Sequence, residues 1–132
     1  MLFDIFKPKW KHTDKEVRRK AVEELKNQDE LFYVAKNDVD EGIRRVAITK
    51  INDPNILEKL LLTESNFENR IRIVEKIDNE IVLFNIAASD PNVNVRRTAS
   101  EKISGQKELI KLFRTETDKA IKTNIIKKEK FC

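Results

Sequence analysis

The chain has 132 residues with two glycines, three prolines and a charged fraction of 38%, a composition that fits one domain of short amphipathic helices. No apolar stretch is long enough to span a membrane, and the single cysteine, Cys132, excludes an intramolecular disulfide and predicts a reducing, cytoplasmic location. The net charge of +4 does not indicate one broad cationic surface, because residues 1–20 hold seven Lys and Arg against three Asp and Glu, residues 21–106 hold twelve against sixteen, and residues 107–132 hold eight against four.

Residues 1–12 precede the first copy of a repeated motif, and we expect them to form an N-terminal cap. Phe3, Phe6 and Trp10 are large apolar residues without a preceding repeat to cover. We predict that they close the open end of the core, because terminal repeats of stacked arrays are atypical. The segment reads as a degenerate half-repeat in which Pro8 ends a helix early.

A nine-residue motif occurs five times, with starts 26 residues apart and no insertion. The copies begin at Val17, Ile43, Asn69, Val95 and Ile121. Within a copy the apolar residues recur at the spacing of one helix stripe, as Val17, Ala21 and Leu25 do in the first. We therefore predict helices with equivalent buried residues at Ala21, Ala47, Ile73, Ala99 and Ile125. An unbroken period of this kind predicts a repeat architecture.

A second short helix is predicted between successive copies. Its first apolar column is Leu in every case, at Leu31, Leu57, Leu83 and Leu109. The pairs Asp53-Pro54 and Asp90-Pro91 each read as an N-cap followed by proline at the first helical position. Two helices per 26 residues are too short to be stable alone, so stacking is expected to hold them.

The pattern D-P-x-x-x-V-R-x-x-A-x-x-x-I, from Asp90 to Ile103, is similar to HEAT-like repeats. The short period is closest to the bacterial leucine-rich-repeat-variant branch, and the opening FKPKWKHTDKEVRRKAVEEL resembles the N-terminal cap of bacterial HEAT-like proteins. The resemblance implies an all-α fold, a right-handed α-α superhelix (HEAT-like or ARM-like solenoid) of about five helical pairs. It covers nearly the whole chain, so we expect a single domain over residues 1–132.

Basic residues hold the second motif position, and acidic residues stand six positions before most of them. The basic column is Arg18, Arg44, Arg70, Arg96 and Lys122; the upstream column is His12, Asp38, Glu64, Asp90 and Glu116. The resemblance implies that these columns form a structural ladder between adjacent repeats. Arginine suits that role because its planar fork bonds a carboxylate and turn carbonyls together. The alternative is a row of phosphate-binding cations.

The next column is predicted to be an exposed ridge, because it lies opposite the buried alanine position. Its members are Arg19, Arg45, Ile71, Arg97 and Thr123. In the resembling family such a ridge lines the concave surface. Three interpretations stay open: a solvated face, a protein-binding face with Ile71 at its centre, or a nucleic-acid-binding face. Glutamates four residues after Arg19 and Arg97 partly neutralise the column, whereas duplex binding needs unbalanced positive charge.

Few residues suggest chemistry. Asn69 interrupts an apolar column, and a polar amide there needs a hydrogen bond, so we expect either a bond to a turn or a rotated repeat. His12 is the only histidine, which excludes a transition-metal cluster of His and Cys. No nucleophile–base pair or phosphate-binding loop stands out. We expect no catalytic residue, no metal and no cofactor.

The leading hypothesis is a non-enzymatic protein-interaction or scaffold module in a bacterial cytoplasm, with an unknown protein partner. One alternative is a nucleic-acid-binding accessory protein that uses its basic ends. A weaker alternative is a relative of HEAT-like lyases or DNA glycosylases, for which no catalytic residue is named. Specific binding of duplex DNA and insertion into a membrane are not expected.

Overall fold

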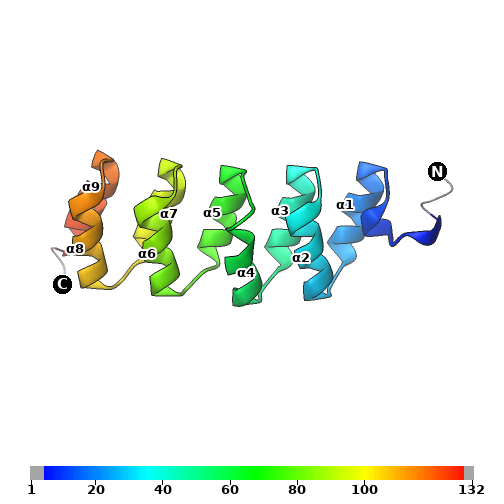
Figure 1. The fold of residues 1–132 in the computed structure, drawn as a ribbon, viewed down its shortest axis with the longest axis horizontal. Helices are drawn as coiled ribbons and strands as arrows, with labels where there is room; N and C mark the ends of the chain where they lie inside the picture. The colour runs from blue at the N-terminus through cyan, green and yellow to red at the C-terminus, as the bar shows by residue number, and fades with distance from the viewer. Residues whose placement is uncertain (1–4, 130–132) are drawn as a thin grey trace. The chain divides into compact units, whose positions relative to one another are not determined.

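A computed structural model of the chain describes residues 5–129. Every secondary-structure element assigned in that range is a helix (Figure 1). The elements are η2 (Lys9–Lys11), α1 (Lys15–Glu24), α2 (Gln28–Asn37), α3 (Glu41–Lys50), α4 (Pro54–Leu60), α5 (Phe67–Glu75), α6 (Glu80–Ser89), α7 (Val93–Lys102), α8 (Gln106–Thr115) and α9 (Lys119–Glu129). The predicted all-α class is confirmed for these residues. Within them, no helix has the length and apolar character needed to cross a membrane. Phe3 and Cys132 lie outside the described residues.

The chain divides into two compact units, Met1–Ile73 and Val74–Cys132, and the division falls inside α5. In the first unit α1 packs against η2 and α3, while α2 packs against α3 and α4. In the second unit α6 packs against α7 and α8, and α9 packs against both α7 and α8. Each unit therefore consists of a layer of odd-numbered helices beside a layer of even-numbered helices (Figure 1).

The 26-residue period of the sequence is the period of the helices. The odd-numbered helices begin at residues 15, 41, 67, 93 and 119, and the even-numbered helices at 28, 54, 80 and 106. The repeated motif begins at the third residue of each odd-numbered helix. The core follows the predicted columns, because Ala47, Ile73, Ala99 and Ile125 are buried and Ala21 is half-buried in the first helix. The four leucines of the even-numbered column are buried as well.

The N-terminal segment differs from the predicted cap. Residues 5–6 have 3-10 conformation, and after Pro8 the 3-10 turn η2 is closed by the Lys11 N–H donating to the Pro8 carbonyl at 2.8 Å. The phenyl ring of Phe6 does not cover the core, since this residue is 86% exposed. Trp10 packs edge-on against Tyr33 of α2, with ring centroids 5.4 Å apart. The prediction that Phe6 closes the core was therefore wrong.

Most helices start at an aspartate or asparagine that caps the first turn. The side chains of Asp14, Asp40, Asn66, Asn92 and Asp118 accept backbone N–H bonds at the starts of the odd-numbered helices, and those of Asn27, Asp53 and Asn79 do so at α2, α4 and α6. The predicted cap at Asp53-Pro54 is confirmed. The cap predicted at Asp90-Pro91 is wrong: Asp90 is the C-cap residue of α6, and α7 begins at Val93 with Asn92 as its N-cap.

We expect Asn79→Ala to lower the free energy of unfolding by about 1 kcal/mol, a typical loss for an N-cap. The Asn79 side chain accepts from the N–H groups of Ile81 and Val82 at 3.0 and 3.3 Å, and alanine leaves both donors without this partner. The matched control is Asn85→Ala, an exposed position within the same helix, where alanine favours helix formation. Equal losses in urea denaturation would show that the cap does not stabilise α6.

Candidate functional site

In the first unit, two arginines of the predicted ladder each join two turns. Arg18 donates from Nε and Nη2 to the carboxylate of Asp38 at 3.0 and 3.3 Å, and from Nη1 to the carbonyls of His12 and Thr13 at 3.1 and 3.0 Å. Arg44 repeats this arrangement with the carboxylate of Glu64 at 3.1 and 3.2 Å and the carbonyl of Asp38 at 2.8 Å. The acceptor carboxylates are almost completely buried, so each guanidinium supplies both the countercharge and the hydrogen bonds that burial requires.

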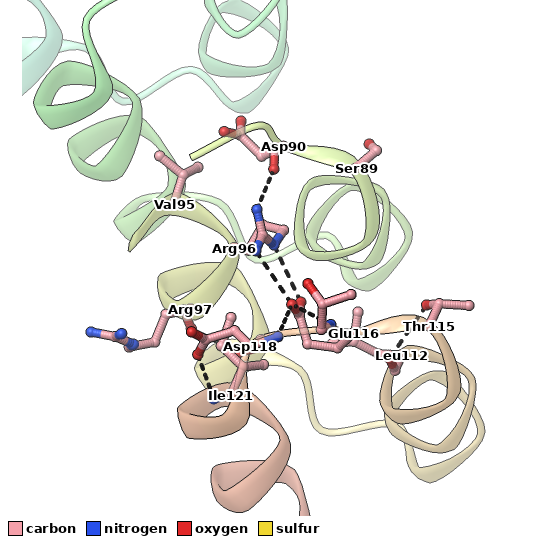
Figure 2. A network of polar contacts seen from close by, with 12 residues as sticks. Ser89, Asp90, Val95, Arg96, Arg97, Leu112, Thr115, Glu116, Asp118 and Ile121 are labelled. Atoms are coloured by element: carbon pink, nitrogen blue, oxygen red, sulfur yellow. Dashed lines mark hydrogen bonds and ion pairs between the residues drawn. The ribbon is translucent and has the colours of Figure 1, made fainter. Parts of the chain in front are cut away.

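The second unit contains the same arrangement around Arg96 (Figure 2). Arg96 donates to both carboxylate oxygens of Glu116 at 3.3 Å and to the carbonyl of Asp90 at 3.0 Å. The Glu116 side chain is 3% exposed. Burial alone would raise the pKa of Glu116, but the N–H of Asp118 and the Arg96 guanidinium stabilise the anion and hold that pKa below its ordinary value.

The carboxylate that each of these arginines binds is not the one six positions before it in the sequence. The residue six positions before each of these arginines contributes its backbone carbonyl, whereas the bound carboxylate lies twenty positions after the arginine. Arg70 likewise donates to the carbonyl of Glu64 at 2.9 Å and to that of Leu61 at 2.8 Å. Asp90 is buried, 5% exposed, at the position equivalent to Asp38.

The acidic column has a second partner that the sequence did not reveal. The side chains of Asp38, Glu64, Asp90 and Glu116 each accept from the backbone N–H two residues later, at 2.9–3.0 Å. That N–H belongs to the residue that caps the following odd-numbered helix. In the first turn His12 takes the same place, since its Nδ1 accepts from the N–H of Asp14 at 2.9 Å. Each acid therefore positions a helix start, and Asp38, Glu64 and Glu116 also neutralise an arginine.

A lysine column supports the opposite ends of the odd-numbered helices, and sequence reasoning missed it. Lys50 donates to the carbonyls of Val22 and Glu23, the last turn of α1. Lys102 and Lys128 do the same for the last turns of α5 and α7. A cation here donates hydrogen bonds to carbonyls that have no partner within the helix, and it is attracted to the negative end of the helix dipole. The signal was present in the sequence as a lysine every 26 residues, at Lys50, Lys76, Lys102 and Lys128.

The ridge residues are half-buried rather than exposed, with Thr123 the exception. Arg19 donates to Glu16 and Glu23 of its own helix at 2.7 and 2.6 Å. Arg45 reaches the next odd-numbered helix, where it donates to Glu68 at 3.1 Å and to Asn69 at 2.9 Å. Ile71 is half-buried on α5. The exposure was overestimated because these side chains lie against neighbouring side chains instead of extending into solvent.

Arg97 differs from Arg45 although both hold the same motif position. Its guanidinium points away from the Arg96–Glu116 pair (Figure 2), and its Nε is buried without a hydrogen-bond partner among the described residues. Residues 23 and 24 positions after Arg45 are Glu68 and Asn69, whereas those after Arg97 are alanine and isoleucine. The second unit therefore lacks the acceptors that hold Arg45.

Asn69 is fully buried, and both ends of its amide are satisfied. The amide donates to the carbonyl of Glu41 at 3.1 Å and accepts from Nε of Arg45 at 2.9 Å. Of the two expected explanations, a hydrogen bond is therefore the one observed, but its partners belong to α3 rather than to a turn. Asn69 serves the structure by fixing Arg45 against α5.

An open cavity of about 600 Å³ lies in the first unit between η2 and α2, and we name it the N-terminal cavity. Its lining combines aromatic and aliphatic side chains with charged ones: Phe6, Pro8, Trp10, Tyr33, Val34 and Val39, and Lys7, Lys11, Arg18 and Asp38, beside His12 and Asn37. The Lys11 ammonium lies 5.0 Å from the Trp10 ring centroid and 4.5 Å from that of Tyr33. Sequence reasoning identified Trp10 only as part of a cap.

No metal centre is found within residues 5–129, where no group of three or more His, Cys, Asp or Glu side chains is placed to hold an ion. Comparisons of the chain with protein-family models, with curated proteins and with solved structures find no match. The two candidate surfaces are therefore defined by this chain's own contacts: the part of the predicted ridge that lies in the first unit, Arg19, Arg45 and Ile71, and the N-terminal cavity.

We expect Arg96→Ala to lower the free energy of unfolding by about 3 kcal/mol or more, because it leaves the buried carboxylate of Glu116 without its countercharge. Arg97→Ala is the matched control on the same helix. It removes a guanidinium that has no hydrogen-bond partner among the described residues, so a change below about 0.5 kcal/mol is expected. Chemical denaturation of the two variants measures the difference, and a larger loss at Arg97 would refute the ladder.

We expect Glu116→Gln to reduce the pH dependence of stability on the acid side. The pKa of Glu116 is lowered in the folded state, so its contribution is fully present above the ordinary value of 4.5 and is lost as the pH falls through the folded value. The wild type should exceed the variant in stability near neutral pH, and the difference should shrink below about pH 4.5. A pH-independent difference in unfolding free energy would contradict this assignment.

Proposed function

We propose that this chain is a HEAT-like right-handed α-solenoid that acts without catalysis as a protein-binding module in the cytoplasm. The shared 26-residue period of sequence and helices supports this proposal, as do the arginine and lysine columns that recur with the same period. Helices of about ten residues are marginal alone, so contacts of this kind between successive pairs suit a stacked array. Such an array presents fixed side chains to a partner.

The observation that carries the proposal is the pairing of two of the three ridge arginines, Arg19 and Arg45, with carboxylates. Arg19 is bound by Glu16 and Glu23, and Arg45 by Glu68. A surface that binds nucleic acid gains affinity by neutralising phosphates with uncompensated cations. Arginines that already have carboxylate partners suit a mixed protein surface better, with Ile71 as a half-buried apolar group at the equivalent motif position of α5. We therefore propose the ridge as the partner-binding surface.

Binding of single-stranded or double-stranded nucleic acid is the second candidate, and one observation favours it. The last two helices carry exposed cations, Lys107, Lys111 and Arg114 on α8 and Lys119 and Lys127 on α9. A polyanion would be attracted to them with an affinity that falls steeply with salt. This basic end accounts for weak attachment to nucleic acid without selecting a sequence.

We expect no submicromolar binding of labelled duplex DNA, single-stranded DNA or RNA at physiological salt, and any weak binding should vanish by about 0.2 M salt. Fluorescence anisotropy titrations measure this. We also expect a protein captured from nuclease-treated native extract by the wild type to be lost with Ile71→Glu. The matched control is Leu62→Glu, an apolar and exposed position in the turn after α4.

Melting curves check that Ile71→Glu remains folded. Submicromolar nucleic-acid binding that persists above this salt concentration would replace the proposed function with the second candidate. Equal capture by wild type and Ile71→Glu would remove the ridge as the binding surface.

A further inference from the structure

The N-terminal cavity gathers apolar side chains that a folded chain usually covers. Phe6 and Val39 are 86% and 89% exposed, and Tyr33 is 47% exposed, yet all three line the same cavity. Single exposed apolar residues are ordinary, but a contiguous group around a hollow marks a binding surface. Its volume of about 600 Å³ lies in the range of cavities that accept a small ligand or a few side chains.

The charge of the lining favours an anionic ligand. Arg18 and Asp38, both in the lining, neutralise each other through two hydrogen bonds, and Lys11 adds a cation to the same lining. Lys11 forms no ion pair with any residue of the described range, and its ammonium is held by two aromatic rings. A carboxylate that entered the cavity would find this cation already positioned.

The arrangement of the rings favours a peptide over nucleotide bases. Trp10 and Tyr33 meet at 64°, and the Lys11 ammonium lies over both of them. Stacked bases need open and successive ring faces, which this pair does not present. The aliphatic walls formed by Pro8, Val34 and Val39 suit a bulky side chain such as leucine or phenylalanine.

The cavity is also preorganised by the first step of the ladder. Arg18 binds the carbonyls of His12 and Thr13 on one side and Asp38 on the other. These contacts tie the segment after η2 to the end of α2, which together form the walls. A rigid site loses less conformational entropy when it binds a ligand.

We propose that the N-terminal cavity binds a short acidic segment of a partner protein, with one bulky apolar side chain inside the cavity and a carboxylate at Lys11. This rests on the proposed function as a protein-binding module and adds a site separate from the ridge. The contact requires both an apolar group and negative charge, so neither an acidic nor an apolar peptide alone satisfies it.

Trp10 is the single tryptophan of the chain, so its fluorescence reports on this cavity alone. The probe is a synthetic peptide with a Leu-Phe pair between runs of Asp and Glu. One control peptide carries Lys in place of the acidic residues, and another carries Ser in place of the Leu-Phe pair. The first should change Trp10 emission saturably, and both controls should bind at least about tenfold more weakly.

Two variants of the full chain test the location. Val39→Glu places a carboxylate on the exposed rim, and Lys11→Glu reverses the charge inside; each should weaken the acidic peptide by about tenfold or more. Leu62→Glu introduces the same change at a position 84% exposed and outside the cavity lining, and should leave affinity within about twofold of the wild type. Val39→Glu is not expected to affect folding, so a loss of binding in this variant reports the site.

Several outcomes would overturn the proposal. They are tighter binding of a single-stranded oligonucleotide than of the acidic peptide, no saturable change in Trp10 emission, or equal losses in Val39→Glu and Leu62→Glu. Sedimentation equilibrium adds a further one: a dimer of the wild type that Val39→Glu dissociates would show that a second copy fills the cavity. The peptide titration uses purified components and tests only the cavity, whereas capture from extract with Ile71→Glu tests the ridge. Failure of one proposal can therefore be distinguished from failure of the other.

Discussion

The guanidinium that joins one turn to the carboxylate of the next repeat is the interaction on which the rest of the structure depends. Arg44 satisfies the carbonyl of Asp38 and the carboxylate of Glu64 at once. Glu64 in turn accepts the N–H of Asn66, which caps α5. The side chain of Glu64 is 2% exposed, so without arginine its charge would be uncompensated away from water. Each such group thus fixes the position of a helix start relative to the preceding pair, within the unit that contains it.

The lysine contacts complete this arrangement at the other end of the odd-numbered helices. The ammonium of Lys128 lies against the last turn of α7, and burial lowers its pKa below the ordinary value. A lysine is kept there because the carbonyls of a helix end have no partner within the helix and carry the negative end of its dipole. Polar contacts therefore hold both ends of these helices, and buried apolar residues such as Leu83 and Ala99 form the core between the two ends. Short helices that are marginal alone gain their stability from this combination.

Periodicity predicted the helices and the core because burial repeats with the helix spacing, so the register of Ala47, Ala99 and Leu83 could be derived from the sequence. It could not identify partners, because a column states which positions are equivalent and not which positions touch. Asp90 illustrates the limit: an aspartate before proline resembles an N-cap, but this one closes α6 and leaves the cap of α7 to Asn92. The N-terminal cavity was equally hidden, since it forms where the repeat pattern ends and Trp10 meets Tyr33.

The columns that hold the helices together vary little, whereas the positions around them differ between repeats, and that contrast supports the proposal that a partner binds at the varying positions. Arg45 and Arg97 occupy equivalent sites, but Glu68 and Asn69 hold the first, while the second has no acceptor among the described residues. Asn69 provides one of those bonds, and to do so it places a polar amide at a core position that is otherwise apolar. The ladder contacts involve neither Asn69 nor Glu68, so the packing of one repeat on the next does not require these two residues. What Glu68 and Asn69 alter is the charge and the hydrogen bonding of Arg45 on the ridge, the property that a partner would sense.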